Sequence, residues 1–133
     1  MDPHTVSLVQ DSWAKVLPIS ETAGKLFYTN LFEADPRLKA LFKGNIDQQA
    51  VKLMQMINAA VGKLDDPGTL IPILQQLGKR HVDYGVKPEH YGTVGAALLK
   101  TLEQGLGPAF TPEIWSAWST VYGVMTEVMT KPA

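Results

Sequence analysis

The chain has 133 residues and no cysteine, so its length suits one hydrophobic core, and disulfides, zinc–thiolate sites, iron–sulfur clusters and cysteine nucleophiles are excluded. Apolar residues make up 45% and charged residues 19% of the chain, the balance of an ordinary globular domain. The net charge of −1, without a basic cluster, argues against nucleic acid as a partner, and no apolar run suits a signal peptide or a transmembrane helix. We therefore expect one domain over residues 1–133, in the cytoplasm and away from membranes.

Apolar residues recur at helical spacing along the whole chain, and turn-forming residues divide this pattern into separate helices. Thr5 is the predicted N-cap of the first helix, and Pro18 ends that helix. Ser20 is predicted to cap the second helix, whose apolar face reaches Leu31. The apolar face of the first helix consists of Val6, Val9, Trp13, Val16 and Leu17.

Proline, glycine and polar residues divide the middle of the chain. Asp35-Pro36 predicts a short helix through Phe42, because a capping residue followed by proline is typical of a helix start. Gly44-Asn45 breaks the chain, and a long helix then continues towards Asp66-Pro67-Gly68. Gly85 stops the helix after that. The apolar face of this helix carries Ile73, Leu74, Leu77 and His81.

Two more helices complete the chain. Pro88 opens the first of them, which ends at Gly105 and Gly107. Thr111-Pro112-Glu113 predicts the start of the last helix, since it places a cap, a proline and an acid at the positive helix end. The apolar face of the last helix consists of Ile114, Trp115, Trp118, Val121, Tyr122, Met125 and Met129. We predict an all-α fold of six long helices and one short one, crossing at steep angles rather than forming a regular bundle.

His81 raises the question of function, because it lies on the apolar face of its helix, close to where that helix ends. One interpretation is a neutral core histidine that is hydrogen-bonded at both ring nitrogens. The other is a ligand to haem iron, since no second histidine or cysteine is spaced for zinc. Apolar inward faces favour haem, and so do cations suited to its propionates, namely Lys52, Lys79 and Arg80.

Tyr28 and Gln49 offer polar groups on apolar helix faces. Gln49 shares its face with Leu53, whereas the neighbouring Gln48 shares the solvated face with Lys52. Local capping by Gln49 and simple burial of the Tyr28 ring are the alternative interpretations. Together, an inward tyrosine and an inward glutamine provide two hydrogen-bond donors to a polar guest in an apolar pocket.

The chain resembles the globins over nearly its whole length, most closely the bacterial single-domain globins, and its later part also resembles neuroglobin. The resemblance joins Trp13, the tracts FYTNLF and DPRLKALF, the glutamine and leucine of residues 49–53, and LGKRHVDYGV, in that order. Such a joint match is specific, although each piece alone is weak. The resemblance implies a globin fold, with its helices around a pocket for haem b.

The resemblance also implies site residues. His81 would be the proximal ligand of a five-coordinate ferrous iron, with Tyr28 and Gln49 stabilising bound O2 on the other side. Leu53 would be the apolar distal residue, and Gly24 and Ala50 would let two helices cross closely. Residues that would line the haem faces or its edge are Phe42, Lys52, Arg80, Val86, Tyr91 and Val94. Neither His90 nor His4 is expected to bind the iron.

The resemblance implies a protein that binds O2, CO and NO reversibly, for oxygen transport or storage. It leaves open a nitric oxide dioxygenase or peroxidase-like activity, and a haem-based gas or redox sensor. Glutamine stands where animal globins have a distal histidine, so a bis-histidine iron is not expected. Flavohaemoglobins pair a tyrosine, which Tyr91 matches, with a glutamate near the end of the last helix, where this chain has Lys131-Pro132-Ala133. We also expect no flavin domain. We therefore expect a separate reductase, and a monomer or weak dimer.

Overall fold

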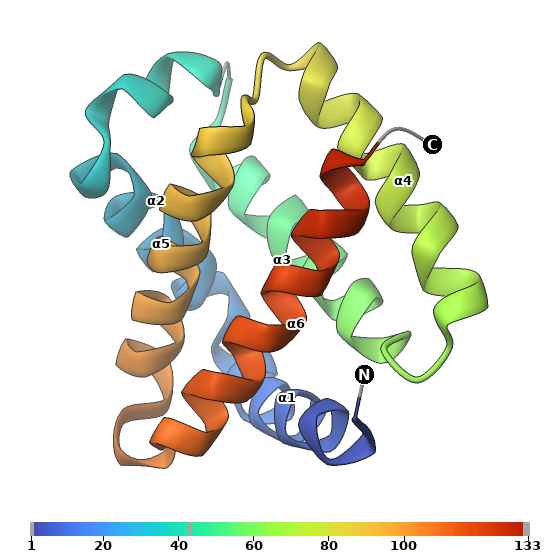
Figure 1. The fold of residues 1–133 in the computed structure, drawn as a ribbon. Helices are drawn as coiled ribbons and strands as arrows, with labels where there is room; N and C mark the ends of the chain where they lie inside the picture. Colours follow the sequence, from blue (N-terminus) through green and yellow to red (C-terminus); the bar gives the residue numbers. More distant parts are fainter. Residues whose placement is uncertain (1, 43, 132–133) are drawn as a thin grey trace.

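In the computed structural model, residues 2–42 and 44–131 are described, and they form six α-helices and three short 3-10 helices without any strand (Figure 1). The α-helices are α1 Pro3–Val16, α2 Ser20–Ala34, α3 Ile46–Gly62, α4 Pro67–Asp83, α5 Pro88–Leu106 and α6 Pro112–Thr130. The 3-10 helices are η1 Leu17–Ile19, η2 Pro36–Leu41 and η3 Gly107–Ala109. The predicted all-α fold is confirmed, and η2 is its expected short helix.

The first two helices begin differently from the prediction. Asp2, not Thr5, caps α1, because its carboxylate accepts a hydrogen bond from the backbone N–H of His4 at 3.1 Å. Thr5 lies inside the helix. Ser20 is the first residue of α2 and caps nothing, since η1 already turns the backbone into α2. Both corrections concern single residues at a boundary, where a neighbouring polar group or turn outcompetes the predicted cap.

Side-chain caps open four other helices, and the sequence predicts two of them, Asp35 and Thr111. The Asp35 carboxylate accepts from the N–H of Arg37 at 3.1 Å and opens η2. Asn45 opens α3 by accepting from the N–H of Asp47 at 2.8 Å. Capping side chains also open α4 and α6, where they belong to Asp66 and Thr111. Short polar side chains therefore define where the chain changes direction.

Two tryptophans join the first helix to the last. The rings of Trp13 and Trp118 lie 6.1 Å apart, and Trp118 is completely buried. The indole N–H of Trp118 donates to the Ser12 hydroxyl at 2.8 Å, and that of Trp13 donates to the Asn58 side chain at 2.9 Å. Because both indole N–H groups are satisfied, these large rings enter the core without an unpaired donor. α1 is thereby fixed against both α3 and α6.

α2 crosses α3 at a place that only small residues permit. A Cβ on Gly24 would lie 3.0 Å from the Cβ of Ala50 and 3.1 Å from its carbonyl oxygen. The close approach expected for this pair is therefore present. On its other side, α2 meets α5 through the Asn30 amide, which donates to Thr101 at 3.0 Å and to Gln104 at 2.9 Å. The two contacts fix α2 between its neighbours.

Three residues expected on apolar faces are instead exposed. Ile73 and Trp115 are 41% and 49% exposed, and Leu17 lies exposed in η1. The apolar stripes of α4 and α6 are wider than the area that neighbouring helices cover, so residues at the margin of each stripe remain in solvent. Leu17 lies in η1, beyond the end of α1, so its side chain does not continue the apolar face of α1.

α4 lies at one side of the molecule, next to α6 (Figure 1). Among the described residues, α4 packs closely along α6 but makes no comparable helix contact with α3 or α5. None of the helices in residues 2–42 and 44–131 combines the length and the apolar character that a membrane crossing needs. The side of α4 that is not covered by α6 carries the site described next.

Candidate functional site

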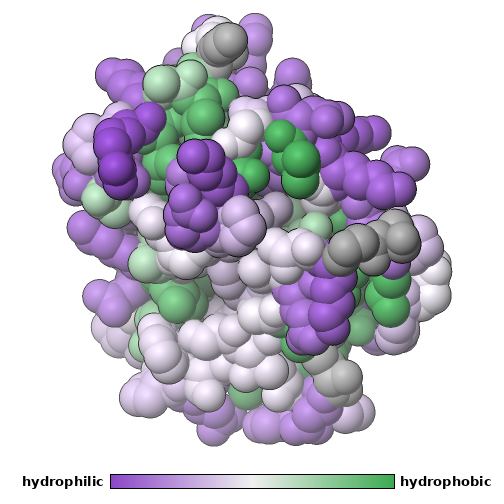
Figure 2. Space-filling view, turned by 45° about the horizontal axis from the view of Figure 1, so that its top comes forward, coloured by the Kyte–Doolittle hydropathy of each residue, from purple (hydrophilic) through white to green (hydrophobic). Residues whose placement is uncertain are grey.

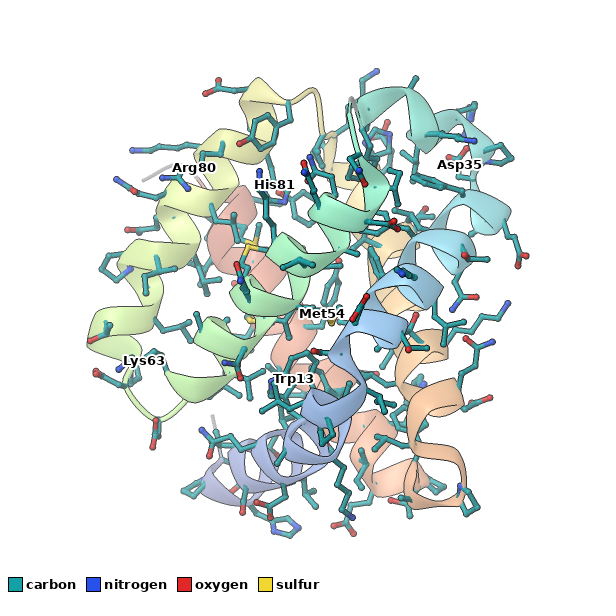
Figure 3. The ribbon with its side chains drawn as sticks, turned by 180° about the vertical axis from the view of Figure 1, so that it is seen from behind. Trp13, Asp35, Met54, Lys63, Arg80 and His81 are labelled. Atoms are coloured by element: carbon teal, nitrogen blue, oxygen red, sulfur yellow. The ribbon has the colours of Figure 1, made fainter. Side chains whose placement is uncertain are left out.

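His81 lies in the last part of α4, on the side that faces α3 (Figure 3). Its Nδ1 atom is 2.8 Å from the carbonyl oxygen of Leu77, one helical turn back. Because a carbonyl oxygen only accepts, Nδ1 carries the proton and the lone pair of the ring belongs to Nε2. Nε2 makes no hydrogen bond to the described residues, and the side chain is only half-buried. One ring nitrogen is thus bonded to Leu77, whereas the alternative of a histidine bonded at both nitrogens has no counterpart in residues 2–42 and 44–131.

Two tyrosine rings flank the imidazole. The ring of Tyr91 stacks near it, with 6.2 Å between centroids and 26° between planes, and burial raises the pKa of the Tyr91 phenol. The ring of Tyr84 lies at the same centroid distance, although Tyr84 is 63% exposed. The hydroxyl of Tyr122 donates to the Tyr91 carbonyl oxygen at 2.6 Å, which ties the start of α5 to α6. Two aromatic rings thus lie near the imidazole, one from the end of α4 and one from the start of α5.

The sequence did not assign roles to Tyr84 and Tyr122. Tyr122 was placed only on an apolar face, and such spacing cannot show that its hydroxyl reaches a carbonyl group 31 residues away in the chain. Tyr84 follows His81 by three residues, which is a detectable signal, because residues three apart on a helix are neighbours.

Aromatic side chains from α2 and the end of η2 form a cluster around Tyr28. The ring of Tyr28 lies 5.2 Å from that of Phe42 in an edge-to-face arrangement and 5.8 Å from that of Phe32. Tyr28 is 5% exposed, and burial raises its pKa to about 12. The phenol therefore stays protonated near neutral pH and can donate a hydrogen bond.

The Tyr28 hydroxyl has no hydrogen-bond partner among the described residues, yet its oxygen atom is not fully buried. In residues 2–42 and 44–131, Ser119 Oγ is the only fully buried side-chain polar atom that lacks a partner. The oxygen of Tyr28 therefore faces accessible space, while its ring is packed. A polar atom placed in that space could receive the hydrogen bond.

The first half of α3 presents the other predicted polar group. Gln49 is half-buried and Gln48 is exposed, as their different helix faces predict. Leu53, one turn after Gln49, is half-buried against the core, and Lys52 is exposed. Geometry alone does not bring Gln49 and Tyr28 into contact, and their roles at this site stay predictions.

The apolar residues predicted around the site are less buried than the core. Phe42, Leu53, Val86 and Val94 are each half-buried, whereas the main core residues are almost fully buried. The end of η2 approaches the turn after α4, since Leu41 Cδ2 would lie 3.6 Å from a Cβ on Gly85. Figure 2 shows apolar side chains at the surface at this end of the molecule, surrounded by hydrophilic residues. These residues fit an apolar guest that would complete their burial, with an imidazole lone pair available to a metal.

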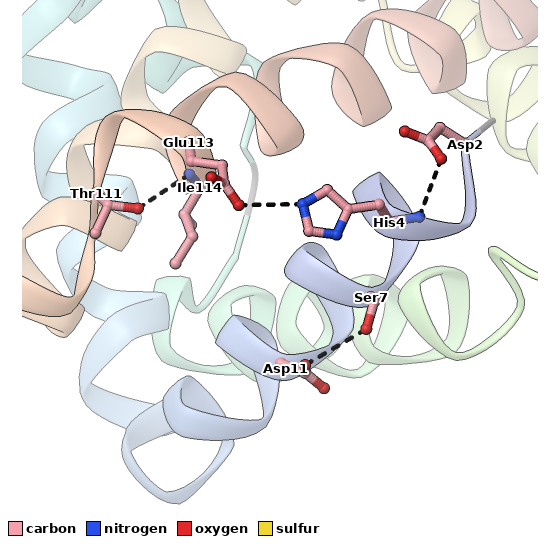
Figure 4. A network of polar contacts seen from close by, with 7 residues as sticks. All are labelled: Asp2, His4, Ser7, Asp11, Thr111, Glu113 and Ile114. Carbon is pink, nitrogen blue, oxygen red and sulfur yellow. Dashed lines mark hydrogen bonds and ion pairs between the residues drawn. The ribbon is translucent and has the colours of Figure 1, made fainter.

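The other two histidines are engaged elsewhere. His4 lies at the start of α1, where its Nε2 is 3.2 Å from the Glu113 carboxylate (Figure 4). His90 accepts a hydrogen bond at Nδ1 from the backbone N–H of Lys87 at 3.0 Å and so caps α5. Arg80, predicted at the haem edge, is exposed on α4 next to His81. Of the three histidines, His81 is therefore the one that lies at the candidate site with its Nε2 unbonded to the described residues.

Six crossing α-helices without a strand in the described residues, with a half-buried imidazole near the end of the fourth, define a class of all-helical proteins. The sequence profile named Globin matches residues 25–129 of this chain. The chain belongs to the globin family.

Curated relatives agree with this assignment. Neuroglobin of Danio rerio is 34% identical over an alignment of 138 residues, gaps included. The alignment covers 93% of this chain and 87% of neuroglobin. The flavohemoprotein of Bacillus subtilis is 32% identical, and that of Rhodopirellula baltica is 35% identical, each over 96% of this chain. This chain spans only about a third of the length of those flavohemoproteins, namely 33% and 32%.

A solved structure shows the same fold. It is an engineered carbene transferase from a Rhodothermus marinus protein described as a nitric oxide dioxygenase. It superposes with a TM-score of 0.88 at 25% identity, covering 98% of this chain and 91% of that one. The predicted globin fold is therefore confirmed.

Proposed function

We propose that this protein holds haem b through His81 and binds diatomic gases reversibly. The observation that carries the proposal is the hydrogen bond from His81 Nδ1 to the Leu77 carbonyl oxygen at 2.8 Å, which leaves the Nε2 lone pair available. Membership of the globin family supports it. When bound, haem would supply a ferrous iron that takes up O2, CO or NO.

His81 would be the one protein ligand to the iron. The bond from Nδ1 to Leu77 fixes the tautomer and the orientation of the ring, and it raises the basicity of Nε2. Tyr91, stacked near the ring, restricts its rotation. His81 is thus prepared for ligation by its own helix and by the start of α5.

On the α2 and α3 side, Tyr28 and Gln49 would donate hydrogen bonds to a polar or partly charged gas ligand. The Tyr28 phenol is a neutral donor with its pKa raised to about 12. A hydrogen bond to a charged acceptor contributes about 1.5–3 kcal/mol. Such donors would favour O2 over CO, because CO develops less charge.

Apolar and cationic side chains would complete the haem site. Phe42, Leu53, Val86 and Val94 are half-buried and would exclude water from the faces of the ring. Lys52 and Arg80 are exposed cations that would attract the acidic edge of haem. Burying the half-exposed apolar groups would stabilise the complex by about 25 cal/mol for each Å² removed from water.

A second candidate function is a nitric oxide dioxygenase that receives electrons from a separate reductase. The solved relative described as a nitric oxide dioxygenase and the flavohemoprotein relatives favour it. For this function, strong donors such as Tyr28 would retain O2 long enough for a second gas molecule to react.

Stopped-flow spectroscopy separates the two functions. The protein is loaded with hemin, reduced, oxygenated and mixed with nitric oxide, and nitrate is counted for each haem while a reductant is present. Reversible gas binding predicts an oxygenated spectrum and its full loss under argon, with no catalytic turnover. Repeated nitrate formation would establish the second function, and the lack of any Soret band after loading would contradict both.

A further inference from the structure

Gly78 occupies the tightest helix contact around α4. It is buried on the side of α4 that packs against α6. A Cβ at this position would lie 2.8 Å from the carbonyl carbon and 2.9 Å from the Cα of Met129, and still closer to its carbonyl oxygen. The obstacle is the backbone of α6, so no side-chain rotation could relieve it. Any residue larger than glycine must therefore separate the two helices.

The position of His81 depends on this contact. His81 follows Gly78 by three residues, and its Nδ1 is bonded to Leu77, the residue directly before Gly78. The ring is thus attached to the same helical turn that rests on Met129. α6 is also the only helix against which α4 packs closely within the described residues. A displacement at Gly78 is therefore expected to move the imidazole, because within the described residues no other helix packs against α4 as closely as α6 does.

We propose that Gly78 is a positioning residue, whose missing side chain lets α4 rest on the α6 backbone at Met129 and so places His81 for ligation. The inference rests on the proposed haem ligation by His81. It goes beyond that function, because it assigns the placement of the imidazole to the helix crossing at Gly78 and Met129 rather than to the groups beside the ring.

Gly78→Ala tests the proposal, and two other glycine variants are its controls. Gly24→Ala also introduces a tight contact, at the crossing of α2 with α3, but away from α4. Gly123→Ala lies in α6, where a Cβ would meet no atom within 4 Å. Resonance Raman spectra of the ferrous, gas-free proteins would report the iron–histidine stretching band, and transfer of hemin to apomyoglobin would report retention.

We expect Gly78→Ala to shift the iron–histidine band and to release hemin several-fold faster, whereas Gly24→Ala and Gly123→Ala keep the parent band. Nitrogen-15 NMR of the imidazole in the hemin-free protein should show the same selectivity, because the bond to Leu77 changes in Gly78→Ala only. Unchanged imidazole and iron–histidine signals in a folded Gly78→Ala protein would overturn the proposal.

A second variant decides the matter if Gly78→Ala does not fold. Met129→Gly loosens the α6 backbone at the contact itself and should shift the same signals, because glycine weakens a helix interior. Met129→Ala is its control, since it removes the same half-buried side chain but keeps a helix-favouring backbone, and it should stay closer to the parent. Parent-like signals in Met129→Gly would overturn the proposal. If instead the parent protein shows no iron–histidine band although its imidazole NMR responds to Gly78→Ala, the proposed haem ligation fails and the positioning of His81 by α6 stands.

Discussion

The tryptophan-containing core and the α4 side of the molecule are completed in different ways. Around Trp13 and Trp118, side chains are almost fully buried and both indole N–H groups have protein partners. Around His81, apolar side chains are half-buried, Nε2 has no partner among the described residues, and α4 packs closely against only one helix. The first region is completed by the chain's own contacts, whereas the second leaves apolar surface and one imidazole nitrogen that the described residues do not satisfy, as the proposed haem site requires.

The largest expected effect is on the α4 side. His81→Ala should abolish stable retention of hemin, because it removes the imidazole lone pair that would bind the iron. Soret absorbance after loading and desalting measures this, and added imidazole should restore part of it. His90→Ala is the matched control and should retain hemin, since His90 only caps α5. A normal five-coordinate ferrous spectrum in His81→Ala would make the assignment wrong.

The second prediction compares two tryptophans of α6. Trp118→Ala should lower the free energy of unfolding by about 3–5 kcal/mol, because a fully buried ring is lost and the Ser12 hydroxyl loses its donor. Trp115→Ala should lower it clearly less, since that residue is 49% exposed and buries about half as much surface. Urea unfolding of the hemin-free proteins measures both. Equal losses would contradict the burial of the two rings.

The third prediction uses one residue type in both regions. Without hemin, Leu102→Ala should lower the free energy of unfolding by about 2–5 kcal/mol. Leu53→Ala should lower it clearly less, because the Leu53 side chain is only half-buried. With hemin bound, the cost of Leu53→Ala should rise towards that of Leu102→Ala. The comparison requires unfolding curves with and without hemin. A cost of Leu53→Ala that hemin leaves unchanged would remove Leu53 from the site.

The fourth prediction concerns the donors. Tyr28→Phe and Gln49→Leu should each speed O2 dissociation, by roughly 10- to 100-fold for a fully aligned donor worth about 1.5–3 kcal/mol, and change CO dissociation far less. The effects of the two substitutions should not add, because both donors would address the same ligand. Flash photolysis and stopped-flow mixing measure both gases. An equal response of CO and O2 would show that charge on the ligand is not what the donors recognise.

Helix positions were predictable because local signals set them. Asp35, Asn45 and Thr111 cap helices where the sequence placed breaks, and the bond from His81 to Leu77 follows from helical spacing alone. The predicted cap of α1 was wrong because Asp2 and Thr5 both have side chains that cap helices well, and only the path of the chain selects between them. Local chemistry thus defines most boundaries, but not the choice between adjacent candidates.

Contacts between distant segments were less predictable. Periodicity assigns Trp115 and Trp118 to one face, although Trp118 is completely buried and bonded to α1 while Trp115 is 49% exposed. Likewise, nothing local distinguishes Gly78 from Gly123, yet one rests on a neighbouring backbone and the other faces open space. The resemblance to globins supplied the Gly24 and Ala50 pair, because a family pattern carries long-range information that spacing lacks.

The contact between Trp118 and Ser12 also has a consequence for the order of folding. These residues are 106 positions apart, and the bond joins the first helix to the last. During translation at about 5–20 residues per second, α1 would wait on the order of 5–20 s for the surface that covers it. Until then the Trp13 ring lacks its partner in α6, so a nascent chain exposes apolar surface that chaperones recognise. Stalling synthesis just before and just after α6 should therefore switch the emerging chain from a protease-sensitive to a protease-resistant state.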